Sequence, residues 1–270
     1  MRRIIVNADD FGYNDVVNEA IINGIERGYI TSSTIMASGV AFDRAVEYAK
    51  QNPKVSFGVH LCIDEFFPLT SKVVFEEYGL TDASGRFIKF GYMNLRETNE
   101  IKQAIYHEWK SQLLKVRNAG VSISHLDSHH HAHTFSFLYE IVEALSKEFL
   151  IDKVRISLHK PLWMKVKEKP SVSLQNNTEL LSCQKRPSRI KALKNNFEMG
   201  LLDNKLKRSF HTTDFFCPLR FYIANKSLLS RYETIELMTH PGLPQYQNET
   251  DLLPLLRQDE SLSFISYIDL

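Results

Sequence analysis

The residues best suited to chemistry lie in one stretch, Ser124–His133, which reads S-H-L-D-S-H-H-H-A-H and is called the histidine stretch below. It holds five of the ten histidines of the chain and one aspartate. Imidazole and carboxylate groups are common ligands of divalent metals, and together they suit Zn, Mn, Co or Mg about equally. We therefore predict one bound divalent metal ion. Mg and Zn are the two leading candidates, and the ligand types leave Mn and Co open.

The histidines of this stretch cannot all bind the same ion. An open catalytic metal site uses about three protein ligands and a water molecule. His129, His131 and His133 are spaced two apart, so they share a face if a strand continues and diverge if the chain turns. The histidines that do not bind the metal would orient its ligands, contact the substrate or hydrogen-bond around the site.

Reactive side chains also follow three other apolar runs, namely Asp9-Asp10, His60 and His240. The carboxyl ends of the strands in a parallel sheet or (β/α) barrel share one face, so these groups could meet the histidine stretch in space. Simpler roles exist for single residues: Asp10 or Asn14 could cap the next helix, and His240 could be a turn residue before Pro and Gly. Four reactive strand ends together nevertheless favour a functional site.

Apolar runs and helical patterns alternate along the first 61 residues and predict the order β-α-β-α-β. The strands are expected at Arg3–Ala8, Thr31–Ala37 and Val55–Leu61. Links this short imply an α/β fold with a mostly parallel sheet and right-handed crossovers.

The rest of the chain continues this alternation less regularly. Residues 62–96 carry many aromatics and several glycines, and we expect a long loop or lid beside the site. The later elements expected are helices at Glu97–Ala119, Phe135–Phe149 and Gln247–Glu260, and strands at Gly120–Ser124, Val154–Ser157, Phe215-Phe216, Thr234–Thr239 and Leu262–Ile268.

Residues 158–210 have the least regular pattern. Three prolines interrupt them, and only Ser188–Leu202 has clear helical spacing, so we expect irregular structure over one mouth of a single domain, 1–270. Residues 153–208 hold 14 Lys and Arg against 4 Asp and Glu, whereas the whole chain has a net charge of +1. This basic segment could be a solvated face, or a rim that attracts an anionic ligand such as a phosphorylated one.

Composition excludes several classes of protein. The small net charge gives no general attraction to nucleic acid, and no apolar run approaches the roughly 20 residues that span a bilayer. The basic N-terminus is followed by too short an apolar run for a secretion signal, so we expect a cytoplasmic protein with no membrane partner. Three unpatterned cysteines indicate neither a disulfide framework nor a thiolate metal site.

The candidate residues together predict metal-assisted hydrolysis. A metal ion would polarise a carbonyl group and lower the pKa of a bound water molecule. A free carboxylate would accept the proton of that water, and a histidine on the opposite side would protonate the leaving group. Of Asp9 and Asp10, one could bind the metal while the other acts as the base.

Four blocks of sequence resemble the YdjC-like carbohydrate deacetylases, which include chitooligosaccharide deacetylases. The blocks are Asn7–Gly12 (N-A-D-D-F-G), Gly58–Leu61 (G-V-H-L), His125–His133 (H-L-D-S-H-H-H-A-H) and His240–Gly242 (H-P-G). They occur in the family's order and span most of the chain, and together they are specific.

The resemblance implies a distorted, TIM-barrel-like (β/α) fold and one divalent metal held by Asp10, His60 and His129. It implies Asp9 as the base and His240 as the acid of a carbohydrate N-deacetylase. The expected substrate is a small N-acetylated oligosaccharide similar to diacetylchitobiose, from which acetate is released. The remaining candidates, for orienting ligands or contacting substrate, are Asp127, His131 and His133.

Three further expectations stay open. Phe66, Phe67 and Tyr92 could stack on sugar rings or simply pack the loop. The protein could be a homodimer. The rival functions are a metal-dependent phosphoesterase on a similar barrel, which would usually need two or three metals, and a non-catalytic protein that binds metal or sugar.

Overall fold

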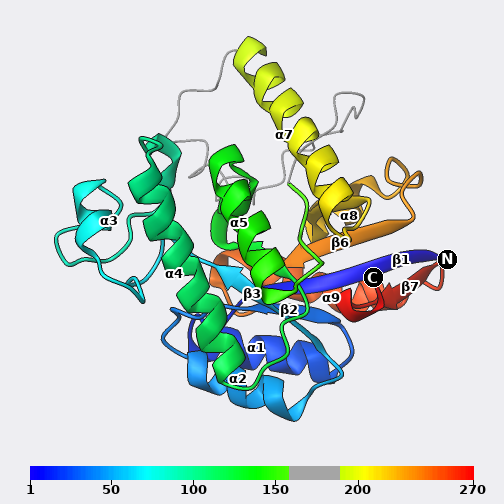
Figure 1. Cartoon of the computed structure of the whole chain (residues 1–270). Coiled ribbons are helices and arrows are strands. Elements are labelled where there is room, and N and C mark those ends of the chain that lie inside the picture. Colours follow the sequence, from blue (N-terminus) through cyan, green and yellow to red (C-terminus); the bar gives the residue numbers. More distant parts are fainter. Residues whose placement is uncertain (158–188) are drawn as a thin grey trace.

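The computed structural model describes residues 1–157 and 189–270. The chain alternates between strands and helices, as the sequence predicts (Figure 1). The strands are β1 Arg2–Phe11, β2 Ser32–Ile35, β3 Ser56–Leu61, β4 Leu126–Ser128, β5 Phe215–Pro218, β6 Thr234–Thr239 and β7 Leu262–Ile265. The helices are α1 Asp15–Glu26, α2 Phe42–Gln51, α3 Val73–Glu77, α4 Asn99–Asn118, α5 Ser136–Phe149, α7 Arg189–Ser209, α8 Leu219–Asn225 and α9 Gln247–Arg257.

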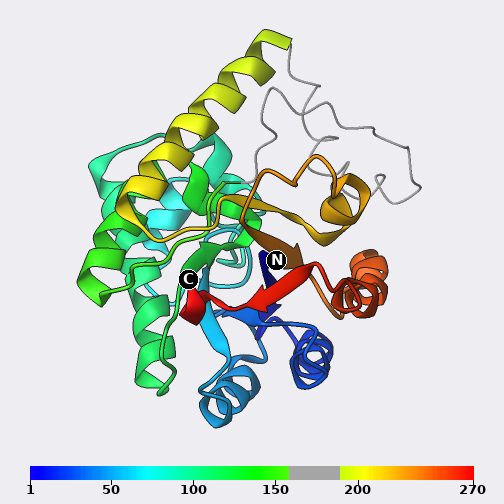
Figure 2. The same cartoon turned by 90° about the vertical axis from the view of Figure 1, so that its right-hand side faces the viewer.

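The strands form one parallel sheet in the order β4-β3-β2-β1-β6-β5. The last strand, β7, pairs with residues 2–5 of β1, while β2 pairs with residues 7–11. The sheet curves into an open, half-closed barrel with helices around its outside (Figure 2). This confirms the predicted TIM-barrel-like α/β fold, and it puts the carboxyl ends of β1, β3, β4 and β6 on one face.

Local sequence signals fix the early elements. The Asn14 side chain accepts a hydrogen bond from the Val17 backbone N–H and caps α1, so the capping alternative holds for Asn14 and not for Asp10. Gly58 lets β3 approach β4, because a Cβ atom there would lie 2.7 Å from the carbonyl oxygen of His125. Glycine in this predicted strand therefore serves close packing against the histidine stretch.

The region between β3 and α4 contains little regular structure, as expected. It consists of α3, a short 3-10 turn at Gly91–Asn94 and a single bridge between Thr81 and Phe87. The buried carboxylate of Glu108 in α4 accepts hydrogen bonds from the backbone N–H groups of Leu69 and Thr70 and so fastens this region to the barrel.

Four elements differ from the predictions. The strand expected at Gly120–Ser124 is displaced, because β4 covers only Leu126–Ser128, inside the histidine stretch. The expected strand Val154–Ser157 is reduced to isolated bridges at Lys153 and Val154. Helix α8 was not predicted, and α7 extends seven residues beyond Leu202. The irregular structure expected at 158–188 lies outside the described residues.

None of the helices in the described ranges combines the length and apolar character that a membrane span needs. Two of the three cysteines, Cys62 and Cys217, are buried and free.

Candidate metal centre

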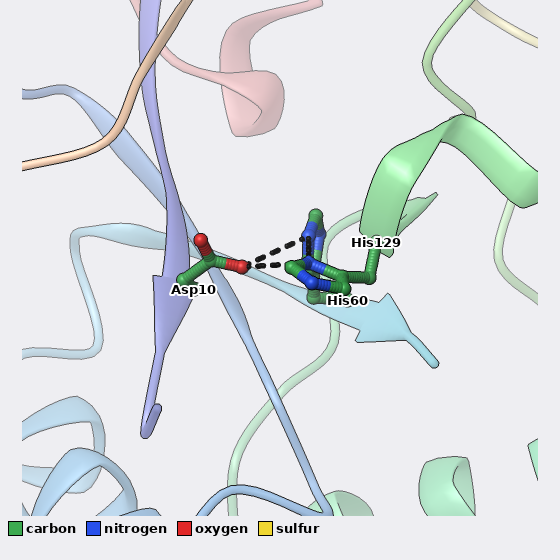
Figure 3. A group of neighbouring side chains, drawn as sticks. All are labelled: Asp10, His60 and His129. Carbon is green, nitrogen blue, oxygen red and sulfur yellow. Dashed lines mark hydrogen bonds and ion pairs between the residues drawn. The ribbon is translucent and has the colours of Figure 1, made fainter. Parts of the chain in front are cut away.

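Three side chains from three strand ends converge at the centre of the barrel face (Figure 3). Asp10 Oδ1 lies 3.0 Å from His129 Nδ1 and 3.3 Å from His60 Nε2. The two ring nitrogens are 3.4 Å apart. These are the three residues that the family resemblance implies as metal ligands.

The backbone turns these side chains into the site. The pairing of β1 with β2 shifts register between Ala8 and Phe11, and Asp10 adopts a left-handed conformation with φ of 69°. His129 follows β4 directly, and the chain then turns through His130 and His131 with φ values of 49° and 58°. Positive φ is uncommon outside glycine, and three such residues in one small region indicate a backbone shaped by function.

The donor set fits a divalent cation. Asp10 Oδ1 is buried and accepts no hydrogen bond, although two imidazole nitrogens lie within ion-pair distance. Burial favours the neutral acid, but His129 and His60 outweigh it and hold the pKa of Asp10 well below its usual range. An ionised, buried carboxylate that faces two ring nitrogens is an arrangement that metal coordination would satisfy.

A carboxylate behind His60 fixes the orientation of its ring. His60 Nδ1 lies 2.7 Å from Asp127 Oδ1, and the two residues are register partners on β3 and β4. The Thr34 hydroxyl donates to the other oxygen of Asp127. Such a carboxylate–imidazole pair fixes the tautomer of a metal ligand and raises its basicity. The structure thus places Asp127 where an orienting residue would lie.

Asp9 faces a different partner from Asp10. Both of its oxygens accept hydrogen bonds from the guanidinium of Arg155, at 2.7 and 2.8 Å, and Asn7 donates to Oδ1. Burial would raise the pKa of Asp9, but Arg155 outweighs it and lowers that pKa. Carboxylate oxygens of Asp9 and Asp127 and a nitrogen of His60 lie within 4.8 Å of one another, so Asp9 borders the ligand cluster.

Arg155 is the centre of a fully buried charge cluster. Besides Asp9, it contacts Asp127 at 2.7 Å and Glu236 at 2.8 Å, and the Tyr267 hydroxyl donates to Glu236. The sequence reasoning missed Arg155, Glu236 and Tyr267. A usable signal was present, because arginine in K-V-R-I-S and glutamate in T-I-E-L-M-T stand inside apolar runs, where a charge needs a buried partner.

His240 follows β6, whose last residue, Thr239, is the register partner of Ala8. It therefore lies beside the strand end that carries Asp9 and Asp10. Burial would lower the pKa of His240, but Glu249, Asp9 and Asp10 outweigh it and raise that pKa. Gly242 in the same turn has φ of 83°, and a Cβ atom there would lie 2.8 Å from the carbonyl oxygen of Val16.

The other histidines of the stretch have separate environments. His133 bonds through Nδ1 to the Ser128 hydroxyl and through Nε2 to the Arg155 carbonyl, and burial lowers its pKa to about 4. His131 packs edge-on against Phe216, and burial lowers its pKa well below the usual range. His133 thus ties the turn to the Arg155 segment, and neither residue belongs to the Asp10 cluster.

The three aromatic residues suggested as sugar platforms, Phe66, Phe67 and Tyr92, differ in their exposure to solvent. Phe66 and Tyr92 are buried, and the Tyr92 hydroxyl donates to the carbonyl oxygen of His130. Phe67 is 54% exposed. Loop packing therefore accounts for Phe66 and Tyr92, and only Phe67 has the exposure that a sugar platform would need.

The fold and this cluster define a TIM-barrel-like α/β protein with a candidate divalent-metal centre at the carboxyl ends of its strands. The model of the YdjC-like protein family matches residues 3–266. The chain therefore belongs to the YdjC-like family, as the sequence motifs predicted.

Related proteins agree with this family. A carbohydrate deacetylase of Clostridium beijerinckii is 28% identical over 93% of this chain and 96% of its own length. One from Vibrio parahaemolyticus is 39% identical, but the match covers 54% of this chain and 56% of the relative. Several relatives thus match over little more than half of their length.

A solved structure from Enterococcus faecalis V583 is similar over 99% of this chain and 98% of its own, with a TM-score of 0.71 and 19% identity. That protein was provisionally named for cellobiose-phosphate cleavage. At this identity, the likeness supports the fold alone.

Proposed function

We propose that this protein is a metal-dependent hydrolase that removes acetyl groups from N-acetylated sugars and releases acetate. The observation that carries the proposal is the convergence of Asp10, His60 and His129 within 3.0–3.4 Å, beside a second carboxylate and a histidine from adjacent strands. The family and the names of the relatives support the same reaction.

Asp10, His60 and His129 would hold one divalent ion, either Mg or Zn. When bound, the ion would polarise the acetamide carbonyl and make a water molecule more acidic. Asp127 keeps the His60 ring oriented, with Nδ1 toward the carboxylate and Nε2 toward Asp10. These three side chains would hold the ion, and Asp127 would keep one of them in the orientation that binding needs.

Asp9 would accept the proton of the attacking water. Its pairing with Arg155 keeps the carboxylate ionised and fixes its orientation, although it also makes the group a weaker base. His240 would protonate the departing amine, and its raised pKa favours the protonated ring that this step needs. His131 and His133 are proposed to support the turn or meet the substrate.

The test is acetate release from N,N′-diacetylchitobiose by wild-type protein, Asp9→Asn and His129→Ala, with metal content measured in each. We expect Asp9→Asn to lose activity by at least about 100-fold, the usual contribution of a general base. His129→Ala should lose at least as much, because the metal would no longer polarise the carbonyl group. His129→Ala should also lose the metal, whereas Asp9→Asn should keep it. Asp15→Asn and His107→Ala change exposed residues of the same types and should match the wild type.

Activity that persists in both Asp9→Asn and His129→Ala would refute the proposal. A phosphorylated sugar is a second candidate substrate, because residues 153–208 carry an excess of ten positive charges. Assays with 6-phosphorylated and plain disaccharides separate the two. Phosphate release instead of acetate, together with two or more metals per chain, would identify a phosphoesterase.

A further inference from the structure

A buried glutamate on α9 holds His240 by two contacts. Glu249 Oε2 accepts a hydrogen bond from the backbone N–H of His240 at 3.1 Å and lies 3.3 Å from ring Nδ1. Glu249 is 1% exposed, whereas the His240 side chain is 13% exposed. The carboxylate therefore lies behind the histidine, and the ring is the more accessible partner.

The other oxygen of Glu249 faces an arginine on α8. Arg220 Nε lies 3.2 Å from Glu249 Oε1, and its side chain is 22% exposed. One carboxylate is thus shared between a permanent cation and a titratable ring. Because Arg220 neutralises part of the charge of Glu249, it weakens the attraction that this charge exerts on a protonated His240.

An aromatic ring restrains His240 from its face. Tyr246 stacks on the imidazole with ring centroids 4.3 Å apart and an interplanar angle of 23°. The ring of His240 thus directs Nδ1 to Glu249 and has one face covered by Tyr246. No described residue hydrogen-bonds to its other nitrogen, Nε2. The strand register places the backbone of His240 beside Asp9, so Nε2 is the nitrogen available to a reacting group.

We propose that Glu249 is a positioning residue that fixes His240 in the Nδ1–H tautomer with Nε2 free for proton transfer, and that Arg220 moderates its influence. This inference rests on the proposed role of His240 as the acid. Among the residues that the structure describes, the charged and titratable groups around the ring are Asp9 and Asp10 on β1, Glu249 on α9, Arg220 on α8 and Tyr246 in the turn before α9.

The two charged partners of His240 have opposite expected effects. Burial lowers the pKa of His240, but the hydrogen bond and the charge of Glu249 are the largest influences that raise it. Glu249→Gln should therefore lower the pKa of His240, while an amide oxygen can still accept the same hydrogen bonds. Arg220→Met should raise that pKa, because the full charge of Glu249 then acts on the ring.

The experiment follows the His240 ring by NMR titration in Zn²⁺-loaded protein, with the signal assigned by its loss in His240→Asn. We expect a pKa about 1 pH unit lower in Glu249→Gln and a smaller rise in Arg220→Met. In acetate release, the basic limb of the pH–rate profile should move to lower pH in Glu249→Gln and to higher pH in Arg220→Met. The kcat of Glu249→Gln should fall roughly 10- to 100-fold with little change in KM, since general acids contribute about 10²- to 10⁴-fold.

Glu108→Gln is the matched control, because Glu108 is also a buried glutamate with several hydrogen bonds but belongs to the loop attachment. It should lower thermal stability and leave the His240 titration unchanged. An unchanged His240 pKa in Glu249→Gln, or equal shifts of the same sign in both variants, would overturn the inference. The NMR titration decides this even if the wild type releases no acetate, an outcome that would refute only the proposed function.

Discussion

Two adjacent carboxylates, Asp9 and Asp10, belong to clusters that neutralise buried charge in different ways. In the first, called the arginine cluster here, Asp9, Asp127 and Glu236 surround the guanidinium of Arg155. In the second, the ligand cluster, Asp10 meets only the imidazoles of His60 and His129 among the described residues. The arginine cluster thus contains its own permanent cation. The ligand cluster needs protonated imidazoles or a metal ion to neutralise the charge of Asp10.

This difference explains why neighbouring aspartates can have different roles. The guanidinium of Arg155 keeps Asp9 ionised and fixed in orientation, which suits the role of base proposed for it. Imidazoles are neutral or charged depending on pH, so the ligand cluster can exchange protons for a metal ion. Asp9 and Asp10 are consecutive residues near the end of β1, and Asp10 has a left-handed φ of 69°.

The largest effect should come from removing the charge of the ligand cluster. Asp10→Ala takes away the only carboxylate among the three proposed ligands, and a bound metal would lower the activation barrier by several kcal/mol. We expect acetate release to fall by about 10³-fold or more, since each 1.4 kcal/mol is a factor of ten. Metal analysis should show loss of the ion, while Asp15→Ala, at an exposed helix start, should retain both metal and activity.

Substitution in the arginine cluster should mainly lower the free energy of unfolding. Arg155→Met leaves three buried carboxylates without their cation, and breaking a buried ion pair costs about 3–5 kcal/mol. Urea unfolding followed by circular dichroism measures the loss. Arg44→Met breaks only exposed ion pairs with Asp15 and Glu19 and should leave the free energy of unfolding nearly unchanged. Equal costs for the two variants would contradict the comparison.

Asp127 touches both clusters, so its substitution tests their connection. Asp127→Asn weakens the support of His60, and losing such an orienting carboxylate typically costs 10- to 100-fold in metal affinity. Calorimetric titration with Zn²⁺ gives the affinity. Asp152→Asn, on the exposed surface, is the control. Unchanged metal affinity in Asp127→Asn would mean that the ring of His60 is held by other contacts.

The smallest expected effect concerns how much a bound metal ion raises the stability of the protein at different pH values. Burial lowers the pKa values of His60 and His129, but Asp127 and Asp10 outweigh it and raise both. In metal-free protein, the protonated rings of His60 and His129 stabilise the fold through their ion pairs. This contribution is complete below about pH 6.5, the pKa of histidine in the unfolded chain, and is lost as pH rises through the folded pKa values. Metal needs neutral rings, so its benefit should grow with pH.

Thermal unfolding with and without Zn²⁺ at pH 6.0 and pH 8.5 measures this effect. A tenfold gain in affinity is worth about 1.4 kcal/mol, so the rise in Tm on adding metal should be about 3–6 °C larger at pH 8.5. His129→Ala should remove the pH-dependent difference. A metal-induced rise in Tm that is larger at pH 6.0 would place the ion elsewhere.

The sequence was sufficient for the parallel sheet and for most of the candidate site. Apolar runs of β1, β3 and β6 mark strands because such strands are buried on both faces, and the reactive residue after each run lies at the same barrel face. The weakest predictions concerned β4 and Val154–Ser157. Both segments are short, and their conformation depends on pairing with neighbours instead of on their own pattern.

The sequence by itself determined the set of ligand-type side chains and their order along the chain. Tertiary structure alone decided which partner each one faces: Arg155 lies 146 residues from Asp9, and Glu249 meets His240 from α9, across the turn that follows β6. Local propensity reports the conformation of a few neighbouring residues. The charge state of a buried group is set by whatever lies within a few ångströms of it, and residues distant in sequence supply most of those neighbours.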